Sequence, residues 1–294
     1  MNSNIELFRQ YLIYEKGLSL KTVESYIHDI FLLENYFKGK KLEDISYQNL
    51  QSFLKNLYEL NIKSRSQARI LSGIKAFYKF LNYSNVLNNN PTELLESPKF
   101  EMKLPDFLTV DEINSIFNSI DLSTKEGHRN RAIAEILYGC GLRVSELVNL
   151  KISNLFLDED FIKVVGKGDK ERLIPIGETA KKMIKLYIDG ERKKIKAKKG
   201  EEDFVFLNRR GSHLTREMIF TYVKKWVSDA KIEKKVSPHT FRHSFATHLI
   251  EGGADLRAVQ QMLGHENITT TEIYTHLDQD YLRTNIILYH PRNK

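Results

Sequence analysis

Cysteine is nearly absent from this sequence. Its 294 residues include a single one, Cys140, so no intrachain disulfide can form. A chain without disulfides is typical of the reducing cytoplasm, and we expect the protein to work there. Cys140 lies between two glycines, next to apolar helical segments, and we interpret it as a small packed residue and not as a nucleophile.

Long apolar runs are missing as well. No stretch is long and apolar enough to span a bilayer, and residues 1–17 carry charges where a signal peptide has an apolar core. We therefore expect no membrane partner. The formal net charge is +7, and a basic balance of this kind favours nucleic acid as a partner.

Proline is scarce too, and its distribution divides the chain. Three of the six prolines, Pro91, Pro98 and Pro105, fall in one short span. Proline has no amide hydrogen and disfavours helix just before it, so this span is interpreted as a linker. We predict three parts: an N-terminal domain at 1–97, a linker at 98–105 and a second domain at 106–294.

The predicted fold is mainly α-helical with a small β-sheet. In the N-terminal domain, apolar residues recur at helical spacing in four segments, at residues 3–16, 20–37, 46–57 and 64–83. Four amphipathic helices with short links indicate a helical bundle. The second domain is mixed: two short apolar runs, 161–165 and 172–176, predict a β-hairpin, and residues 204–207 are expected to add a third strand.

The fourth helix of the bundle begins with basic and amide side chains, which are Lys63, Arg65, Gln67 and Arg69. Side chains of these types at the start of a helix can contact phosphates or base edges. We treat the four as candidate DNA contacts. An ordinary solvated helix face is the alternative.

A candidate phosphate site begins at Ser237. Ser237 can cap a helix and Pro238 suits its first turn, so His239 and Arg242 are expected to share one face near the helix N-terminus. The free N–H groups and partial positive charge of such an end favour a phosphate. His265 follows a glycine, and Tyr274 comes nine residues later. A His, an Arg and a Tyr around one phosphate suggest covalent phosphoryl transfer.

Two further residues have the right chemistry for this reaction. Arg143 precedes Glu146 by three residues, which is the spacing of a helical ion pair. The pair is either an ordinary surface ion pair, or Glu146 holds the Arg143 guanidinium in place to bind two phosphate oxygens. Lys167 lies at the predicted hairpin tip, where it could donate a proton to a leaving oxygen. Gly168 follows it in place of Ser or Thr, so the loop is not a nucleotide-binding P-loop.

A zinc site is the competing interpretation of the histidines. His239 and His243 have the i,i+4 spacing of a zinc pair, and His248 follows. Thr240 stands where a metalloprotease needs its glutamate, however, and cysteine ligands other than Cys140 are missing. We therefore expect no metal.

The motifs together resemble the tyrosine recombinase (phage integrase) family, and within it the bacterial Xer recombinases. The resemblance rests on GLRVSELVNL at 141–150, VVGKGDKERLIPIG at 164–177, SPHTFRHSFATHLIEGGADLRAVQQMLGH at 237–265 and TTTEIYTHL at 269–277. A small departure is Phe241, where leucine is more usual. The resemblance covers nearly the whole chain and implies a SAM-like N-terminal bundle followed by a mixed α/β catalytic domain.

The resemblance also implies a role for each candidate residue. Tyr274 is the nucleophile that forms a 3′-phosphotyrosyl link, and Arg143 and Arg242 bind the scissile phosphate. Lys167 is the general acid, His239 assists proton transfer at the tyrosine, and His265 hydrogen-bonds the phosphate. No metal, ATP or other cofactor is implied.

The implied partner is a double-stranded, dif-like recombination site that is bound between the two domains. The implied biological role is chromosome dimer resolution. Four subunits, of one kind or shared with a second Xer-type recombinase, are expected on two sites, with a DNA translocase as a further partner. The apolar tail with Ile286, Ile287 and Leu288 either docks on a neighbouring subunit or packs against the rest of its own chain. A mobile-element integrase or invertase, a type IB topoisomerase-like relaxer and a catalytically silent DNA-binding protein stay open as alternatives.

Overall fold

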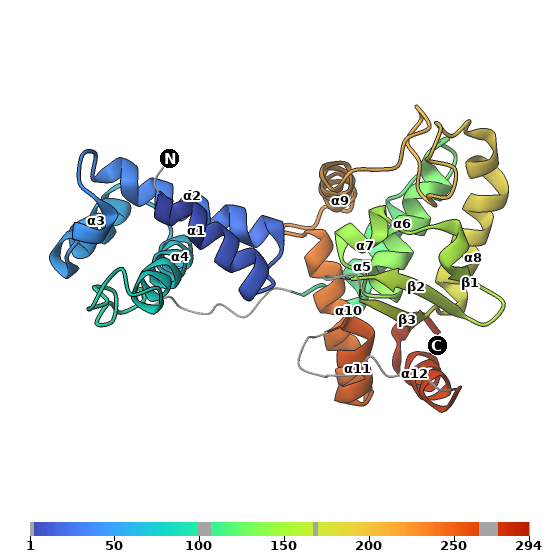
Figure 1. The fold of residues 1–294 in the computed structure, drawn as a ribbon. Coiled ribbons are helices and arrows are strands. Elements are labelled where there is room, and N and C mark those ends of the chain that lie inside the picture. The colour runs from blue at the N-terminus through green and yellow to red at the C-terminus, as the bar shows by residue number, and fades with distance from the viewer. Residues whose placement is uncertain (1–2, 99–106, 167–169, 265–275, 294) are drawn as a thin grey trace. The chain divides into compact units, whose positions relative to one another are not determined.

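The computed structural model describes residues 3–98, 107–166, 170–264 and 276–293 (Figure 1). The chain divides into two compact units, residues 1–103 and residues 104–294. This division falls within the stretch that we interpreted as a linker. Each unit has its own hydrophobic core.

The first unit is the expected four-helix bundle. Its helices are α1 (Ser3–Gln10), α2 (Leu20–Tyr36), α3 (Tyr47–Glu59) and α4 (Ser64–Tyr83), with a π-helical turn at Tyr11–Glu15 and a 3-10 turn at Leu42–Asp44. Ser19 caps α2 by accepting from the amide of Thr22 at 3.3 Å. Ser46 and Asn49 form a capping box at the start of α3. Local capping and one apolar face per helix therefore account for the bundle.

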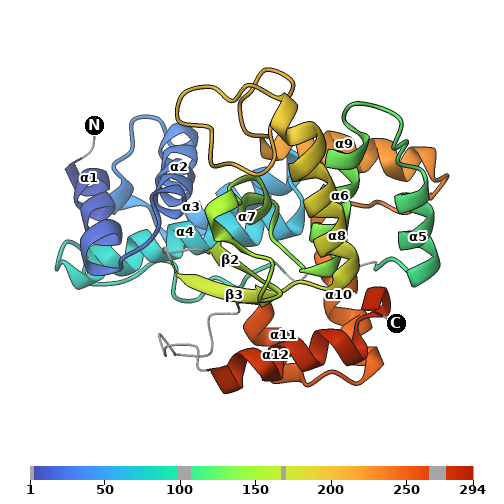
Figure 2. The same cartoon turned by 90° about the vertical axis from the view of Figure 1, so that its right-hand side faces the viewer.

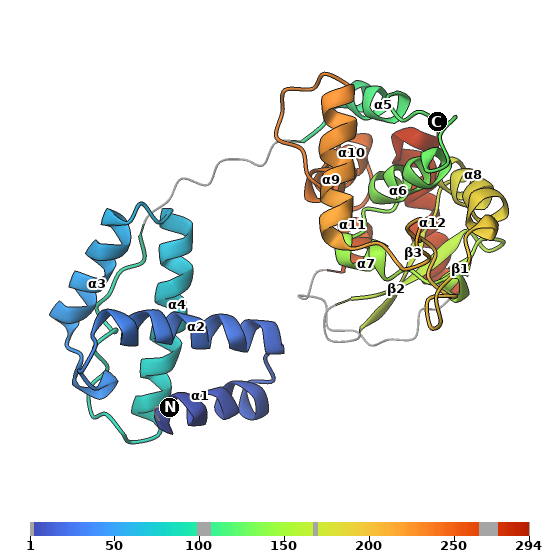
Figure 3. The same cartoon turned by 90° about the horizontal axis from the view of Figure 1, so that it is seen from above.

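The second unit surrounds one almost fully buried helix, α6 (Gly127–Gly139). Its second half, Ala132–Gly139, is apolar except for Glu135, and α6 contacts helices on several of its sides (Figure 3). The helices packed on it are α5 (Val110–Asn118), α7 (Val144–Val148), α8 (Glu178–Tyr187) and α10 (Pro238–Gly252). Thr109 and Glu112 have the spacing of a capping box, and they form one at the start of α5.

The remaining elements complete the unit in the order of the chain. They are β1 (Leu155–Phe156), β2 (Phe161–Val165), β3 (Glu171–Pro175), α9 (Arg216–Asp229), α11 (Leu256–Leu263) and α12 (His276–Tyr289), with short helical turns at Ile152–Asn154, Ile188–Arg192 and Pro291–Asn293. The sheet is antiparallel with the order β1-β2-β3, and Val164 pairs with Arg172. In Figure 2 the sheet lies between α7 and α8 on one side and α11 and α12 on the other. The predicted hairpin is confirmed.

The third strand is not the predicted one. β1 at Leu155–Phe156 completes the sheet, whereas residues 204–207 make only isolated bridges, from Phe204 to Lys151 and from Leu207 to His213. Residues 205–207 are nevertheless almost completely buried. The apolar run therefore reflects burial and not strand pairing, which periodicity alone does not distinguish.

The C-terminal tail packs on its own unit. Leu282 and Ile286 on α12 are each 1% exposed, so Ile286 packs within its own unit here, which is the intramolecular alternative for the tail; docking on a neighbouring subunit stays a prediction. Ile287 and Leu288 point outward, at 49% and 53% exposure. Within the described ranges, no helix is both long and apolar enough to cross a membrane.

Arg292 fastens the end of the tail. Its guanidinium donates to Glu135 on α6 and to Asn114 on α5, the latter at 3.2 Å. Replacing Arg292 with methionine should lower the free energy of unfolding of this unit by about 1–3 kcal/mol, because among the described residues buried Glu135 then keeps only Arg131 as a cation. Urea unfolding followed by the fluorescence of the single tryptophan, Trp226, measures this.

The matched control is Arg283→Met. Arg283 also forms an ion pair, with Asp160, but its side chain is 44% exposed and Asp160 keeps Lys181 as a second partner. We expect a loss below about 1 kcal/mol. Equal losses for the two variants would contradict the anchoring role of Arg292.

Candidate functional site

The position of Arg143 depends on a turn that requires glycine. Gly141 has φ +59°, and a Cβ atom there would lie 2.5 Å from the ring of Phe245. The turn ends α6 and places Arg143 at the N-cap of α7. The Arg143 amide donates to Glu146 Oε2 and its Nη1 donates to Glu146 Oε1, both at 2.8 Å. The predicted i,i+3 pair is confirmed, and it closes the first turn of the helix.

Arg242 enters the same site from α10. Its Nη1 donates to the carbonyl of Gly141 at 2.8 Å, and its Nη2 donates to the carbonyl of Leu263 at 2.5 Å. The side chain is only 12% exposed. Burial, together with the nearby charge of Arg143, lowers the pKa of Arg242 to about 10, so it stays protonated at neutral pH.

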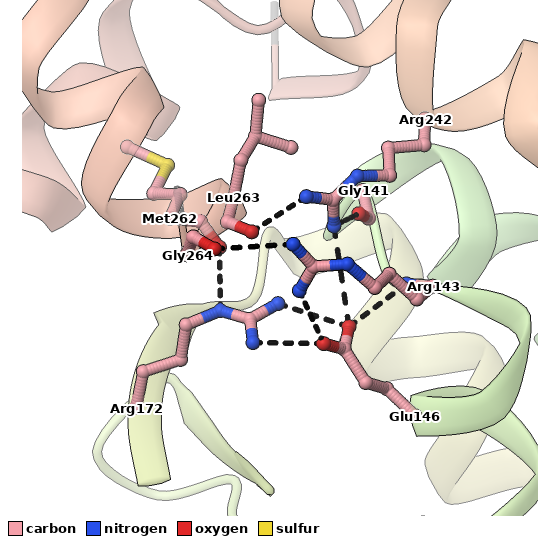
Figure 4. Close-up of polar contacts among 8 residues, drawn as sticks. All are labelled: Gly141, Arg143, Glu146, Arg172, Arg242, Met262, Leu263 and Gly264. Carbon is pink, nitrogen blue, oxygen red and sulfur yellow. Dashed lines mark hydrogen bonds and ion pairs between the residues drawn. The ribbon is translucent and has the colours of Figure 1, made fainter. Parts of the chain in front are cut away.

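Glu146 is the centre of this arginine cluster, which we define as Arg143, Arg172, Arg242 and Glu146 (Figure 4). Arg172 on β3 donates to both carboxylate oxygens of Glu146 at 2.9 Å. The nearest Arg242 nitrogen is 4.0 Å away. Burial opposes ionisation of Glu146, but hydrogen bonds from Arg172 and Arg143 outweigh it and lower its pKa.

The arginine cluster has unbalanced charge. Three guanidinium groups surround one carboxylate, which leaves a surplus of two positive charges in a site where little water competes. The Arg143 side chain is 35% exposed, so it can still reach a bound group. Guanidinium forks suit two oxygens of one phosphate. The cluster is therefore suited to hold a phosphodiester and to stabilise extra negative charge on it.

The structure describes only part of the predicted catalytic set. Arg143 and Arg242 are brought together, and His239 is exposed in the first turn of α10, three residues before Arg242. Lys167, His265 and Tyr274 lie outside the described residues.

The described neighbours of those residues are close to the arginine cluster. The carbonyl of Gly264 accepts from Arg143 Nη2 at 3.1 Å, and Gly264 directly precedes His265. Gly166 directly precedes Lys167, and a Cβ atom added to Gly166 would lie 3.4 Å from Arg172 Nη1.

Arg172 is the member of the cluster that sequence reasoning missed. It lies within a quoted motif, but the strand pattern of residues 172–176 only marks it as part of a hairpin. Its partners are 26 residues away at Glu146 and 90 residues away at Met262. No local spacing signals such contacts, although an arginine inside an otherwise apolar strand is itself unusual.

The DNA contacts predicted for the first unit need one correction. Lys63 and Arg65 are exposed near the start of α4, as a DNA contact requires. Gln67 is 5% exposed and its amide donates to the carbonyl of Ile62 at 2.7 Å, so it stabilises the helix start and does not face DNA. Arg69 is half-exposed, but its guanidinium holds buried Asp29 at 2.6 and 2.8 Å.

One of the three histidines of the competing zinc interpretation, His248, has structural surroundings. His248 is buried and its Nδ1 is 2.8 Å from the hydroxyl of Tyr138. Across the described part of the chain, no three His, Cys, Asp or Glu side chains gather in a way that could hold a metal ion. Cys140 is fully buried, and burial raises the pKa of its thiol, which agrees with its interpretation as a packing residue.

Comparison with known proteins places this fold and site in one family. The phage integrase family model matches residues 106–280, and the model of the phage integrase N-terminal SAM-like domain matches residues 5–84. The chain therefore belongs to the phage integrase family, whose members of this type are tyrosine recombinases.

Curated relatives agree over the full length. Tyrosine recombinase XerD of Staphylococcus epidermidis is 39% identical over 295 residues, which cover 99% of this chain and 100% of the relative. Tyrosine recombinase XerD of Listeria monocytogenes is 40% identical over 296 residues, with the same coverage of both chains.

Solved structures give the same result. The XerH site-specific recombinase bound to a palindromic difH substrate, in a post-cleavage complex, is similar with 25% identity and a TM-score of 0.72. The match covers 97% of this chain and 84% of that chain. The XerA recombinase is 31% identical with a TM-score of 0.51, and 99% of each chain is covered.

Proposed function

We propose that this protein cuts and rejoins DNA strands at a specific site through a covalent 3′-phosphotyrosyl intermediate, with Tyr274 as the nucleophile. The observation that carries the proposal is the arginine cluster, which holds Arg143 and Arg242 side by side with a surplus of positive charge. The membership of this chain in the phage integrase family and its similarity to the DNA-bound XerH recombinase support the same conclusion.

The chemistry balances without an outside energy source. The Tyr274 oxygen attacks the phosphorus and the bond to the 5′ oxygen breaks. The departing 5′ oxygen takes a proton from Lys167 and leaves as a hydroxyl, and the tyrosine proton passes to His239. Arg143 and Arg242 stabilise the charge that develops on the nonbridging oxygens, and His265 donates a hydrogen bond to one of them. The phosphotyrosyl ester conserves the bond energy, so a second 5′-hydroxyl can attack it and rejoin the strands.

The biological role that we propose is chromosome dimer resolution at a dif-like site in the cytoplasm. The full-length similarity to XerD proteins supports it. We assign catalysis to residues 104–294 and additional DNA contacts to Lys63 and Arg65 of the first unit. Four subunits act on two DNA sites, and the exposed Ile287 and Leu288 on α12 are available for contact between them.

The direct test is a suicide substrate. Duplexes that carry candidate chromosomal sites are nicked just beyond the cleavage position, so that a short strand end diffuses away after cleavage and traps the covalent complex. We expect a protease-sensitive, slow-migrating band that retains a label placed at the 5′ end of the cleaved strand, in the presence of EDTA.

A shuffled site of the same composition is the control for specificity. The same reactions, run on native gels with two labelled duplexes of different length, detect four subunits on paired sites as a band that contains both. Tight binding to the site without a covalent band would contradict the proposal and favour a catalytically silent DNA-binding protein.

A further inference from the structure

The last carbonyls of α11 hold three arginines at once. Arg172 Nε donates to the carbonyl of Met262 at 2.8 Å, while Arg242 and Arg143 donate to the next two carbonyls, those of Leu263 and Gly264. Figure 4 shows the three guanidinium groups converging on this helix end. Carbonyls in the last turn of a helix lack internal partners and carry partial negative charge, so cations stabilise them.

Arg172 differs from the other two arginines in how completely it is engaged. All three of its side-chain nitrogens donate within the protein, one to Met262 and two to Glu146. Its side chain is 6% exposed, against 35% for Arg143. The Arg172 guanidinium therefore cannot bind two oxygens of a DNA phosphate unless it loses buried hydrogen bonds to Met262 or Glu146.

Arg172 also lies between the segments that lead to the other site residues. A Cβ atom on Gly264 would lie 3.1 Å from Arg172 Cδ, and Gly264 turns the chain at φ +64° directly before His265. Gly166 abuts its guanidinium directly before Lys167. One side chain thus contacts the base of the hairpin loop, the end of α11 and the carboxylate that holds Arg143.

We propose that Arg172 is a positioning residue for the recombination reaction: it fixes Glu146 and the end of α11, and through them the placement of Arg143 on the scissile phosphate. This inference rests on the proposed function. Without Arg172, burial would favour protonation of Glu146, which would then lose one of the two oxygens that accept from Arg143. Arg143 would keep its charge but lose its alignment.

The test uses Arg172→Gln and Arg172→Lys on two suicide substrates. One has a normal scissile phosphate, and the other has a methylphosphonate, which lacks one charged nonbridging oxygen. On the phosphate we expect covalent-complex formation by Arg172→Gln to slow by about 10²-fold, as for a misplaced catalytic group, with the Kd for DNA changed by less than about 3-fold. Arg172→Lys should fall between this variant and the wild type, because it keeps the charge but not the fork.

The methylphosphonate distinguishes positioning from general damage. When the charge on the phosphate is removed, the placement of Arg143 matters less, so the defect of Arg172→Gln should shrink to below about 10-fold. In an Arg143→Ala background, Arg172→Gln should likewise add little, because both changes remove the same contribution.

Arg192→Gln is the matched control. Arg192 is another buried arginine, 8% exposed, that donates to the carbonyls of Glu202 and Phe204 outside the arginine cluster. Its effect should be the same on both substrates.

Equal defects of Arg172→Gln on the two substrates, or full additivity with Arg143→Ala, would overturn the positioning role. A wild-type protein that forms no covalent complex on any site would instead refute the proposed function, and the inference with it.

Discussion

Tyr274→Phe should abolish the covalent protein–DNA complex while leaving DNA binding within about 3-fold of the wild type. Phenylalanine keeps the ring and removes only the oxygen that would bond to phosphorus, and no other residue of the predicted set is assigned the role of nucleophile. The measurement is the yield of covalent complex on the suicide substrate, beside a gel-shift Kd with an intact duplex. The expected yield is below about one thousandth of that of the wild type.

Tyr281→Phe is the control, because Tyr281 is the next tyrosine along the chain. It lies on α12 at 40% exposure, and burial together with a hydrogen bond to Asp255 raises its pKa to about 12. A phenol with a raised pKa is a poorer nucleophile precursor at neutral pH, so this variant should react at the wild-type rate. A covalent band that survives Tyr274→Phe and disappears with Tyr281→Phe would reverse the assignment.

Arg242→Lys should slow covalent-complex formation by about 10²–10³-fold, although the change is formally conservative. Lysine cannot bridge the carbonyls of Gly141 and Leu263 as the guanidinium does. Burial beside Arg143 already lowers the pKa of Arg242 to about 10. A lysine starts about two units lower than an arginine, so the same surroundings would bring its pKa closer to neutrality.

The sign of the pH effect follows from this difference. A lysine at position 242 is charged below its lowered pKa and neutral above it, so its residual activity relative to the wild type should fall as the pH rises from about 6 to about 9. Arg242 itself stays charged throughout that range. Rates on the suicide substrate, compared at each pH with those of the wild type, provide the measurement. A constant ratio would show that geometry alone, and not charge, limits the variant.

The sequence was a good guide wherever the interaction is local. The pair of Arg143 and Glu146 follows from a spacing of three residues, and the capping box at Thr109 from four consecutive residues. The β-hairpin could be predicted equally well, because its two apolar runs flank a loop that contains Gly and Asp. In each case the residues that interact are held together by one turn of the chain, so a linear pattern contains the geometry.

Patterns were less informative where the partner comes from far along the chain. Gln67 is only two residues from Arg65 in the first turns of α4, but Gln67 is buried and Arg65 is exposed. Residues 204–207 have the composition of a strand, yet tertiary packing buries them without a ladder. Arg172 could not be assigned because its partners, Glu146 and Met262, become neighbours only when β3, α7 and α11 have packed.

The way α11 gathers its arginines has a consequence for the newly made protein. The cluster closes only when residues from Gly141 to Gly264 have all emerged and folded, because Arg242 bonds to the carbonyls of Gly141 and Leu263. A nascent or truncated chain that ends before α11 carries its positive charge but lacks the carbonyls that align it. The aligned arginine cluster is therefore acquired late in synthesis, after α11 has emerged and folded.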